Sequence, residues 1–358
     1  MMKIALDATP LTVPTGGGRR YVEELSRALA ENFPEDEFWL LSDQAFDVPA
    51  PKPGNLNVGQ RPANLVERRW WLWGLQRQMT RLGIDVFHGT EFAVPYLPVR
   101  PSVMTILDLS PWMNESWHAA SRRVRMRTPV VLRMGLATMV VTLSEAVRRQ
   151  AIQRFGLEPG SVFAIPLAAA RMFRAASTPC TARPYLLYVG TLEARKNLAF
   201  LLDVWREVNR EHPVELILAG RRRPDYPEIA PEPGLHLAGA VADEELPKLY
   251  SGALACLYPS CYEGFGLPVL EAMQCGAVVI ASRDPAIAEV AGDAAVLVAA
   301  SDRRAWVETL RSLLAQSEQF AALREKATAR AAQFSWEKTA KLTREVYAEA
   351  AERFRKKT

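Results

Sequence analysis

The stretch LACLYPSCYEGFGLPVLEAMQCGAVVIA, residues 254–281, decides how the rest of the chain is interpreted. It begins with a nearly continuous apolar run, 254–258, and ends with another, 278–281. A loop and a helical segment separate the two runs, and Pro268 suits the first position of that helix because its missing N–H and fixed φ cost nothing there. Apolar runs that alternate with helices are typical of parallel strands covered by helices on both faces.

The same alternation runs through most of the chain. The expected strands of a first series are 3–8, 38–41, 85–88, 102–107, 138–143 and 162–165, and those of a second series are 185–189, 215–219, 254–258, 278–281 and 295–298. Residues 168–184 lack periodicity and carry two prolines. The pattern predicts an α/β protein with two doubly wound domains, 1–170 and 185–340, joined by a linker at 171–184.

Composition excludes several classes of function. Lys and Arg number 44 against 40 Asp and Glu, a surplus too small to imply a nucleic-acid partner. The four cysteines lack CxxC spacing, so neither a zinc site nor a disulfide framework is indicated. No apolar run approaches the length of a membrane span, and the N-terminus does not read as a signal peptide. We expect a cytoplasmic protein that is peripheral to a membrane at most.

Two glycine-bearing loops follow strands, where ligands of such sheets bind. In TGGGRRYVEEL, 15–25, Gly17 and Gly18 open a helix whose N-terminus favours an anion, although a flexible turn is the plainer interpretation. In LLYVGTLEARKNLAFLLDVW, 186–205, Gly190 precedes Arg195 and Lys196, two cations that suit a diphosphate or are simply solvated. The chain contains neither GxGxxG nor GxxxxGK[ST], which argues against a nicotinamide or P-loop site.

The nonapeptide EGFGLPVLE, 263–271, places Glu263 before a Gly-Phe-Gly turn and Glu271 in the first turn of the following helix. A carboxylate at the second position can accept hydrogen bonds from the diol of a ribose, while Glu263 and the turn meet a sugar or phosphate. Three alternatives are a helix N-terminal acid, a surface loop, and a glycosidase-like acid pair. The last leaves the glycine loops and the two cations unexplained.

At this point the residues carry a family resemblance. EGFGLPVLE resembles the E-x7-E element of retaining glycosyltransferases of family 4, which have the GT-B architecture of two Rossmann-like domains facing a cleft. Further similar segments run through the chain: GGGRRY 16–21, DVFHG 85–89, TILDLSP 105–111, VTLSEAVRR 141–149, YVGTLEARKN 188–197, ADEELPKLYSGALACLYPSCYEGFGLPVLEAMQCG 242–276 and AEVAGDAAVLV 288–298. The resemblance implies a C-terminal helix, about 340–358, that packs back on the first domain, with Trp336, Tyr347 and Phe354 as anchors.

The resemblance also implies roles for individual residues. Glu271 would hold the donor ribose, and Arg195 with Lys196 the diphosphate. The groups expected to contact the donor are Gly17, Gly18, Gly190, Gly264, Phe265, Gly266, Leu267 and Glu271, and those expected to be catalytic are Glu263, Asp108, Arg195 and Lys196. No metal and no cofactor are expected, because the cations and a helix N-terminus would stabilise the leaving diphosphate.

One departure from the family pattern concerns the donor sugar. In TILDLSP, Leu107 stands where the family often has His, while Asp108 is kept. The motif around His88 does not match that of the missing histidine. A histidine at the end of a strand, with its hydrogen bonds satisfied within the fold, is the more natural interpretation. The departure leaves open a nucleotide-sugar-binding protein without turnover.

The segment NLVERRWWLWGLQRQMTRLG, 64–83, combines aromatic and basic residues. On a helix, Leu72, Leu75, Met79 and Leu82 share one inward face, and Trp70, Trp73, Arg69, Arg77 and Arg81 fall on the opposite side. Outward Trp and Arg predict contact with an anionic membrane or a lipid-linked acceptor. A second basic run, SRRVRMR, occupies 121–127.

The resemblance implies a metal-independent, retaining hexosyltransferase of polysaccharide assembly, and the basic and aromatic segments predict that it works at the inner face of the membrane. From the resemblance to polysaccharide-assembly members, we expect mannose from GDP-mannose to pass to a glycan or lipid-linked acceptor. A UDP-sugar is the alternative donor.

Overall fold

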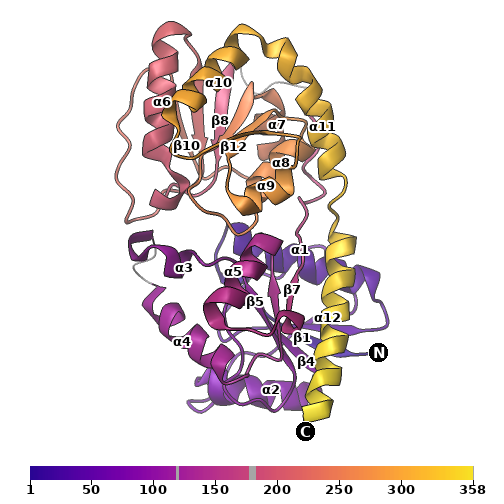
Figure 1. Cartoon of the computed structure of the whole chain (residues 1–358). Coiled ribbons are helices and arrows are strands. Elements are labelled where there is room, and N and C mark those ends of the chain that lie inside the picture. Colours follow the sequence, from indigo (N-terminus) through magenta and orange to yellow (C-terminus); the bar gives the residue numbers. More distant parts are fainter. Residues whose placement is uncertain (118–120, 177–182, 358) are drawn as a thin grey trace. The chain divides into compact units, whose positions relative to one another are not determined.

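The computed structural model describes residues 1–117, 121–176 and 183–357 and divides the chain into two compact units (Figure 1). The first unit comprises Met1–Leu167 with Ser335–Thr358, and the second comprises Ala168–Phe334. Residues 177–182 of the predicted linker lie outside the described residues. Each unit is built on one parallel sheet, so the prediction of two Rossmann-like α/β domains is confirmed.

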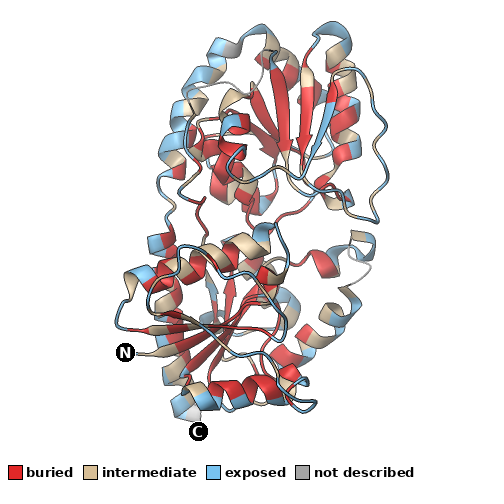
Figure 2. Ribbon diagram, turned by 180° about the vertical axis from the view of Figure 1, so that it is seen from behind, coloured by how far each residue is buried: buried red, intermediate tan, exposed pale blue. Residues whose placement is uncertain are grey.

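The sheet of the first unit has the strand order β3-β2-β1-β4-β5-β6-β7. Its strands are β1 (Lys3–Asp7), β2 (Glu37–Leu41), β3 (Leu56–Val58), β4 (Val86–Gly89), β5 (Ser102–Ile106), β6 (Met139–Thr142) and β7 (Val162–Ala164). The strands β4, β5 and β6 are buried along their whole length (Figure 2), as expected where helices cover both faces of a parallel sheet.

The sheet of the second unit has the order β10-β9-β8-β11-β12-β13, the order of a dinucleotide-binding sheet. Its strands are β8 (Tyr185–Val189), β9 (Glu215–Ala219), β10 (Leu235–Gly239), β11 (Ala255–Tyr258), β12 (Val279–Ser282) and β13 (Val296–Val298). The chain reverses its direction of growth between β8 and β11, which are hydrogen-bonded neighbours at the centre of the sheet.

Helices connect the strands in both units. Those of the first unit are η1 (Thr9–Thr12), α1 (Gly17–Asn32), η2 (Trp70–Gly74), α2 (Leu75–Leu82), α3 (Ser110–Met113), η3 (Glu115–Trp117), α4 (Arg122–Arg133), α5 (Glu145–Phe155), η5 (Pro159–Ser161) and α12 (Trp336–Lys357). Those of the second unit are η6 (Ala194–Lys196), α6 (Leu198–Glu211), α7 (Leu246–Gly252), α8 (Leu267–Gln274), α9 (Pro285–Ala291), α10 (Arg303–Ala315), η7 (Ser317–Phe320) and α11 (Ala321–Ala331).

Two edge strands, β3 and β10, were not predicted. β3 has only three residues, and β10 is exposed after its first residue, so neither shows the continuous apolar run of a buried strand. Both lie at the outer edge of their sheet, where one side of the strand has no partner strand.

The prediction of one helix through 64–83 is wrong in its first half. Residues 70–74 form a π-helical turn, η2, and α2 begins only at Leu75. Hydrogen bonds in such a turn skip five residues, so positions before it no longer follow the 3.6-residue pattern of α2. Trp70 is consequently buried, and it packs in a core cluster with Leu75 and Met79 instead of facing outward.

The last helix, α12, packs against α1 and contacts β4 and β5. Ser335 caps it by accepting a hydrogen bond from the N–H of Lys338 at 3.1 Å. The Tyr347 hydroxyl lies 2.7 Å from His88 Nδ1, and His88 Nε2 lies 2.7 Å from the Thr105 hydroxyl. His88 is therefore a buried histidine with both ring nitrogens paired, which confirms its structural interpretation.

The pairing of His88 predicts a pH-dependent stability. Burial lowers the pKa of His88 to about 3, whereas a histidine in an unfolded chain titrates near pH ~6.5. The unfolded chain therefore binds more protons between these values, and stability falls as the pH drops through that window. We expect the stability difference between wild type and His88→Gln to be largest at pH ~7 and to shrink by up to about 1.4 kcal/mol per pH unit below pH ~6.

Urea unfolding of both proteins at four pH values, followed by circular dichroism, measures this difference. His212→Gln is the matched control, because His212 is exposed and should leave the wild-type pH profile unchanged. A difference between wild type and His88→Gln that stays constant with pH would show that protonation of His88 does not oppose folding.

Candidate donor site

The carboxyl ends of β8 and β11 bring two loops of the second unit together. The first loop runs from Gly190 through η6 to α6, and the second runs from Pro259 to the start of α8. The backbone N–H of Cys261 donates to the carbonyl of Arg195 at 2.9 Å. Asn197, at a left-handed φ of 59°, donates from its side chain to the carbonyl of Pro259 at 3.3 Å. These bonds fix Arg195 and Lys196 against the second loop.

Glu263 lies between the two predicted diphosphate cations. Its Oε1 accepts from Lys196 Nζ at 2.6 Å, and its Oε2 accepts from Arg195 Nη1 at 3.0 Å. Lys196 also donates to the Tyr258 hydroxyl at 2.8 Å. Glu263, Arg195 and Lys196, which come from two separate sequence motifs, thus form one buried cluster, with Glu263 only 6% and Lys196 only 7% exposed.

A second carboxylate, Glu193, faces Arg195 from the other side. Arg195 Nη2 donates to Glu193 Oε1 at 2.8 Å, and Arg223 Nη1 donates to Glu193 Oε2 at 3.0 Å. Neither Glu193 nor Arg223 was predicted as a site residue. Arg223 belongs to a run of three arginines directly after β9, and this run is the sequence signal that identifies it in retrospect.

Asp284, which was also not predicted as a site residue, binds the backbone of Glu263. Asp284 Oδ2 accepts from the N–H of Glu263 at 3.3 Å, and Oδ1 accepts from the N–H groups of Ala286 and Ile287 at the start of α9. Burial raises the pKa of Asp284 to about 6, and the neighbouring carboxylate of Glu263 acts in the same direction. α9 begins at Pro285, directly after Asp284. An acid followed by a proline at the start of a helix is therefore the pattern in the sequence that could have identified Asp284 as a helix cap.

The electrostatics of the cluster are set by burial. Burial alone would raise the pKa of Glu263, but Arg195 and Lys196 outweigh it and hold that pKa at about 2. Burial lowers the pKa of Lys196, Arg195 acts in the same direction, and Glu263 opposes both. Glu263 is therefore ionised, with the two cations paired to its two oxygens.

Glu271 lies one residue further into its helix than predicted. Gly266, at a φ of 95°, ends the loop, so α8 begins at Leu267, one residue before Pro268. Glu271 is therefore in the second turn, which removes the interpretation of a helix N-terminal acid. Its side chain is buried, at 1% exposure for the residue, and Oε2 accepts a hydrogen bond from the Tyr250 hydroxyl at 3.2 Å.

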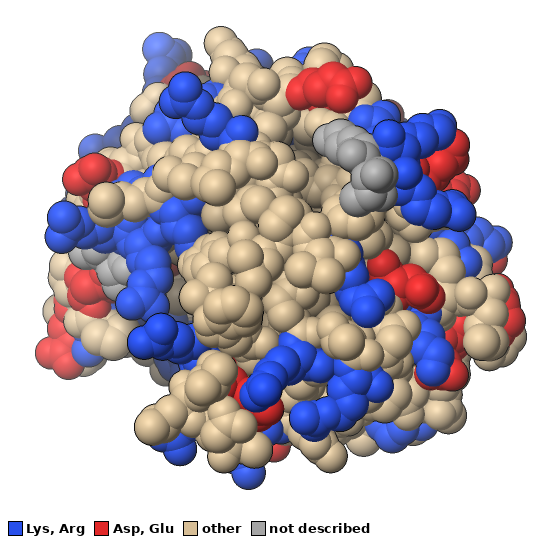
Figure 3. Space-filling model, turned by 90° about the horizontal axis from the view of Figure 1, so that it is seen from below, with Lys and Arg blue, Asp and Glu red and all other residues tan. Residues whose placement is uncertain are grey.

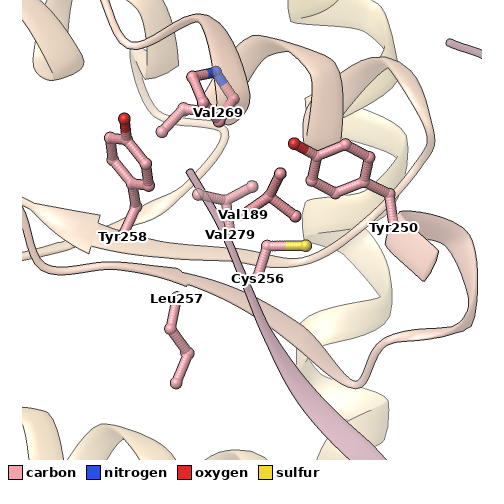
Figure 4. A pocket seen from close by; sticks show the side chains of 8 residues that line it. Val189, Tyr250, Cys256, Leu257, Tyr258, Val269 and Val279 are labelled. Carbon is pink, nitrogen blue, oxygen red and sulfur yellow. The ribbon is translucent and has the colours of Figure 1, made fainter. Parts of the chain in front are cut away.

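The turn between the two glutamates is packed into its unit. Gly264, Phe265, Gly266 and Leu267 are all buried, and Phe265 stands edge-on to Phe334 with 6.1 Å between ring centroids. Any contact of this turn with a ligand is therefore made by backbone atoms. A cavity of about 10 Å³ lies beneath, lined by Tyr250, Tyr258 and apolar side chains of β11, β12 and α8 (Figure 4). That space holds one water at most and is too small for a nucleotide.

The predicted glycines divide into two kinds. Gly190 has a φ of 151°, and a Cβ there would lie 2.9 Å from the Tyr188 hydroxyl, so the fold itself requires glycine. In the first unit, a Cβ on Gly17 would meet nothing within 4 Å, and one on Gly18 would only touch Pro10 at 3.7 Å. Packing within the unit does not explain why glycine occupies positions 17 and 18.

The remaining predicted residues also lie in the first unit. Asp108 follows β5, and its Oδ1 accepts from the N–H of Ser110 at 2.8 Å and from its hydroxyl at 2.6 Å. Among the predicted acceptor or membrane residues, Arg69, Trp73, Arg77 and Arg81 are exposed, as expected for an outward side. Trp70 is the exception, because it is buried in the core.

Several solved structures have the same architecture as this chain. Solved structures with the same fold include HepE of Anabaena in complex with UDP-glucose, with a TM-score of 0.74, 17% identity and coverage of 98% of this chain and 100% of that one. Another is WaaG, a glycosyltransferase involved in lipopolysaccharide biosynthesis, with a TM-score of 0.69, 16% identity and coverage of 95% and 98%. The fold is that of GT-B glycosyltransferases.

Similarity in amino-acid sequence identifies the family to which the chain belongs. Residues 15–168 match the family model of glycosyltransferase family 4, and residues 183–316 match that of glycosyl transferases group 1. The O-antigen chain mannosyltransferase B of Escherichia coli is 31% identical over 376 aligned positions, which cover 94% of this chain and 97% of that protein. The MMP alpha-(1->4)-mannosyltransferase of Mycolicibacterium hassiacum is 29% identical over 226 positions, 60% and 54% of the two chains. The chain belongs to glycosyltransferase family 4.

The cluster predicts how Glu263 contributes to stability. Replacing Glu263 by Gln leaves the buried Arg195 and Lys196 without their shared anion, which should lower the free energy of unfolding of the second unit by about 3 kcal/mol at pH ~7. Because the folded pKa lies below the unfolded one, the contribution of Glu263 is present above pH ~4.5 and is lost as the pH falls toward about 2. The gap between wild type and variant should close in that window.

Guanidinium-induced unfolding of wild type and Glu263→Gln at neutral and acidic pH gives the difference in their free energies of unfolding and its dependence on pH. Glu244→Gln serves as control, since Glu244 is exposed in the same unit. Equal stability of wild type and Glu263→Gln at neutral pH would mean that the two cations do not depend on this carboxylate.

Proposed function

We propose that this chain is a retaining hexosyltransferase that moves mannose from GDP-mannose to a glycan or lipid-linked acceptor in polysaccharide assembly. The observation that carries the proposal is the buried cluster of Glu263, Arg195 and Lys196 at the switch point of the second sheet. Relatives named as mannosyltransferases, one of them for the O-antigen chain, support mannose as the sugar. A UDP-sugar stays the alternative donor.

The donor diphosphate binds beside Arg195 and Lys196 in this proposal. Both cations already pair with Glu263, so the phosphate oxygens share them with that carboxylate, and Arg195 offers the N–H edge of its guanidinium for bidentate contact. Glu271 turns its carboxylate from Tyr250 to the ribose hydroxyls. Glu263, held by Asp284 through its backbone, stays near the donor sugar and positions it.

The transfer step breaks the bond between the anomeric carbon and the diphosphate oxygen, and the electron pair leaves with the diphosphate. The acceptor oxygen forms the new bond on the same face of the sugar, and its proton passes to the departing phosphate oxygen. Negative charge grows on the diphosphate in the transition state, where Arg195 and Lys196 stabilise it. We infer that these two cations do the work for which other transferases use a divalent metal ion.

A second candidate is a nucleotide-sugar-binding protein without turnover. Leu107 follows β5 where the family often has histidine, so an imidazole is missing at that place. The two candidates differ in one measurable property, which is slow release of nucleotide from GDP-mannose in the absence of acceptor. A binding protein would retain the donor intact.

A thermal-shift panel tests the donor assignment. A diphosphate at ~100 times its dissociation constant should stabilise the protein by about 2.7 kcal/mol. We expect GDP to raise the melting temperature of the wild type without magnesium, and Glu271→Gln to lose most of the shift. The Gln side chain can still accept a hydrogen bond from Tyr250, so packing is kept while the ionised partner of the ribose diol is removed.

Glu244→Gln is the matched control and should keep the full shift, since Glu244 is exposed. A shift by UDP instead of GDP would name the alternative donor. A shift that needs magnesium would contradict the metal-independent mechanism, and no shift with any nucleotide would contradict the donor site.

We also propose that the first unit contacts an anionic membrane at the inner face. No helix within the described residues is both long and apolar enough to span a membrane. Seen from below, blue Lys and Arg side chains surround a broad uncharged area, with red Asp and Glu side chains between some of them toward the rim (Figure 3). Trp73, 46% exposed, and the exposed Arg69, Arg77 and Arg81 supply the aromatic and basic groups that such contact uses.

Vesicle flotation tests this contact. We expect recovery with phosphatidylglycerol vesicles but not with phosphatidylcholine vesicles, and a large loss for the triple variant Arg69→Gln, Arg77→Gln, Arg81→Gln, at about 1 kcal/mol per arginine. Arg154→Gln, an exposed arginine on α5, is the control. Equal recovery with both kinds of vesicle, or recovery with neither, would remove the proposal.

A further inference from the structure

The outer face of α4 carries an unusual apolar stripe. Met126, Val130 and Met134 are 64%, 54% and 66% exposed. They follow one another at intervals of four residues, so the three side chains are neighbours on one face. Scattered apolar residues on a surface are ordinary, but a contiguous row of large ones marks a surface that binds something.

The stripe borders a groove with a volume of about 470 Å³. Tyr96, Val131 and Leu136 add apolar lining to the row, and among the residues that the structure describes, Arg123 and Arg127 are the charged side chains that line it. The volume lies within the range of about 300 to 1,000 Å³ that small-molecule sites occupy. Methionine side chains are flexible and polarisable, which suits an apolar ligand without a fixed shape.

Arginines lie at both ends of the stripe. Arg122 and Arg123 are exposed at the start of α4, and Arg133 is exposed at its end. Within the part of the chain that the structure describes, these three guanidinium groups have no hydrogen bond or ion pair through their side chains. No Asp or Glu occurs between positions 121 and 137. The groove therefore combines an apolar channel with uncompensated positive charge.

The groove is continuous with the segment around η2. The N–H of Tyr96 donates to the carbonyl of Trp71 at 2.9 Å, and the Arg127 guanidinium lies over the Trp71 ring, 5.8 Å from its centroid. Trp73, two residues further on, is exposed. The two basic segments that are far apart in the sequence, 64–83 and 121–127, thus form one surface of the first unit.

We propose that this groove binds the lipid end of the acceptor, with an isoprenoid chain along Met126, Val130 and Met134 and its diphosphate at Arg122 and Arg123. The inference rests on the proposed function, because it takes the acceptor to be lipid-linked. Guanidinium groups pair with phosphate oxygens in bidentate geometry, and the chain removes the exposed methionines and valine from water. A single chain suits a hollow groove better than a flat bilayer surface does.

Charge argues against a second copy of this chain as the occupant. A symmetric dimer would bring the same patch of both copies together, so that Arg122, Arg123 and Arg133 of one copy would come close to the arginines of the other. Like charges brought together in an interface oppose association. An anionic lipid has the opposite charge and meets no such barrier.

Titration with farnesyl diphosphate below its micelle concentration tests the proposal, with farnesol and inorganic diphosphate as separate arms. Intrinsic tryptophan fluorescence reports binding near Trp71 and Trp73. We expect farnesyl diphosphate to bind at least tenfold more tightly than either part alone. The pair Met126→Glu with Val130→Glu should weaken it at least tenfold, and the pair Arg122→Gln with Arg123→Gln should weaken farnesyl diphosphate but not farnesol.

Matched controls are Val48→Glu and Arg154→Gln, which alter an exposed valine and an exposed arginine elsewhere in the first unit and should bind like the wild type. Circular dichroism and the nucleotide thermal shift verify that each variant is folded. If the groove variants bind farnesyl diphosphate like the wild type, the proposal is overturned.

If sedimentation shows that these variants only abolish self-association, the groove is an interface between copies and the proposal is equally overturned. If the lipid results hold while no nucleotide shifts the wild type, the lipid site stands and the donor assignment falls. The two proposals therefore fail independently.

Discussion

The buried carboxylate of Glu263 is the constraint on which the donor site depends. An ionised acid that is 6% exposed is tolerated only when cations and hydrogen bonds replace its water, and Lys196 and Arg195 do so at 2.6 and 3.0 Å. Those cations come from the loop after β8, and Glu263 comes from the loop after β11. Only a sheet in which β8 and β11 are neighbours brings them together, so the strand order and the charge cluster require one another.

The same cluster limits how an anionic donor can bind. Arg195, Lys196 and Arg223 already face Glu193 and Glu263, so the site is close to neutral before any ligand arrives. A diphosphate therefore cannot simply fill a positive pocket. It must share the cations with a carboxylate or displace that carboxylate from them. Glu193, which bridges two arginines, can move away without breaking the hydrogen bonds of Lys196. Rearrangement of this kind makes affinity depend on the geometry of the phosphates more than on net charge.

The sequence was informative wherever a residue's environment follows from local pattern. Continuous apolar runs predicted the buried strands around both switch points, and family motifs predicted Glu263, Arg195 and Lys196, which the fold brings into contact. Errors arose where backbone geometry breaks the pattern. The π turn at 70–74 turned Trp70 inward, and the left-handed Gly266 starts α8 one residue earlier than predicted, which places Glu271 in its second turn. Glu193 and Asp284 were missed because one partner of each, Arg223 for Glu193 and the backbone of Glu263 for Asp284, follows a different strand.

The α4 groove shows a different limit of sequence reasoning, because exposure is not a property of a pattern. A helix with Met126, Val130 and Met134 on one side reads as an ordinary helix that packs by that side, yet Thr128, Val131 and Leu132 are the buried residues and the methionines stay in water. Leaving a large apolar row exposed invites aggregation unless a partner covers it. Arg122, Arg123 and Arg133, exposed at the two ends, oppose pairing between like copies and favour an anionic partner, so the row and its charges together support the proposed lipid more narrowly than either does alone.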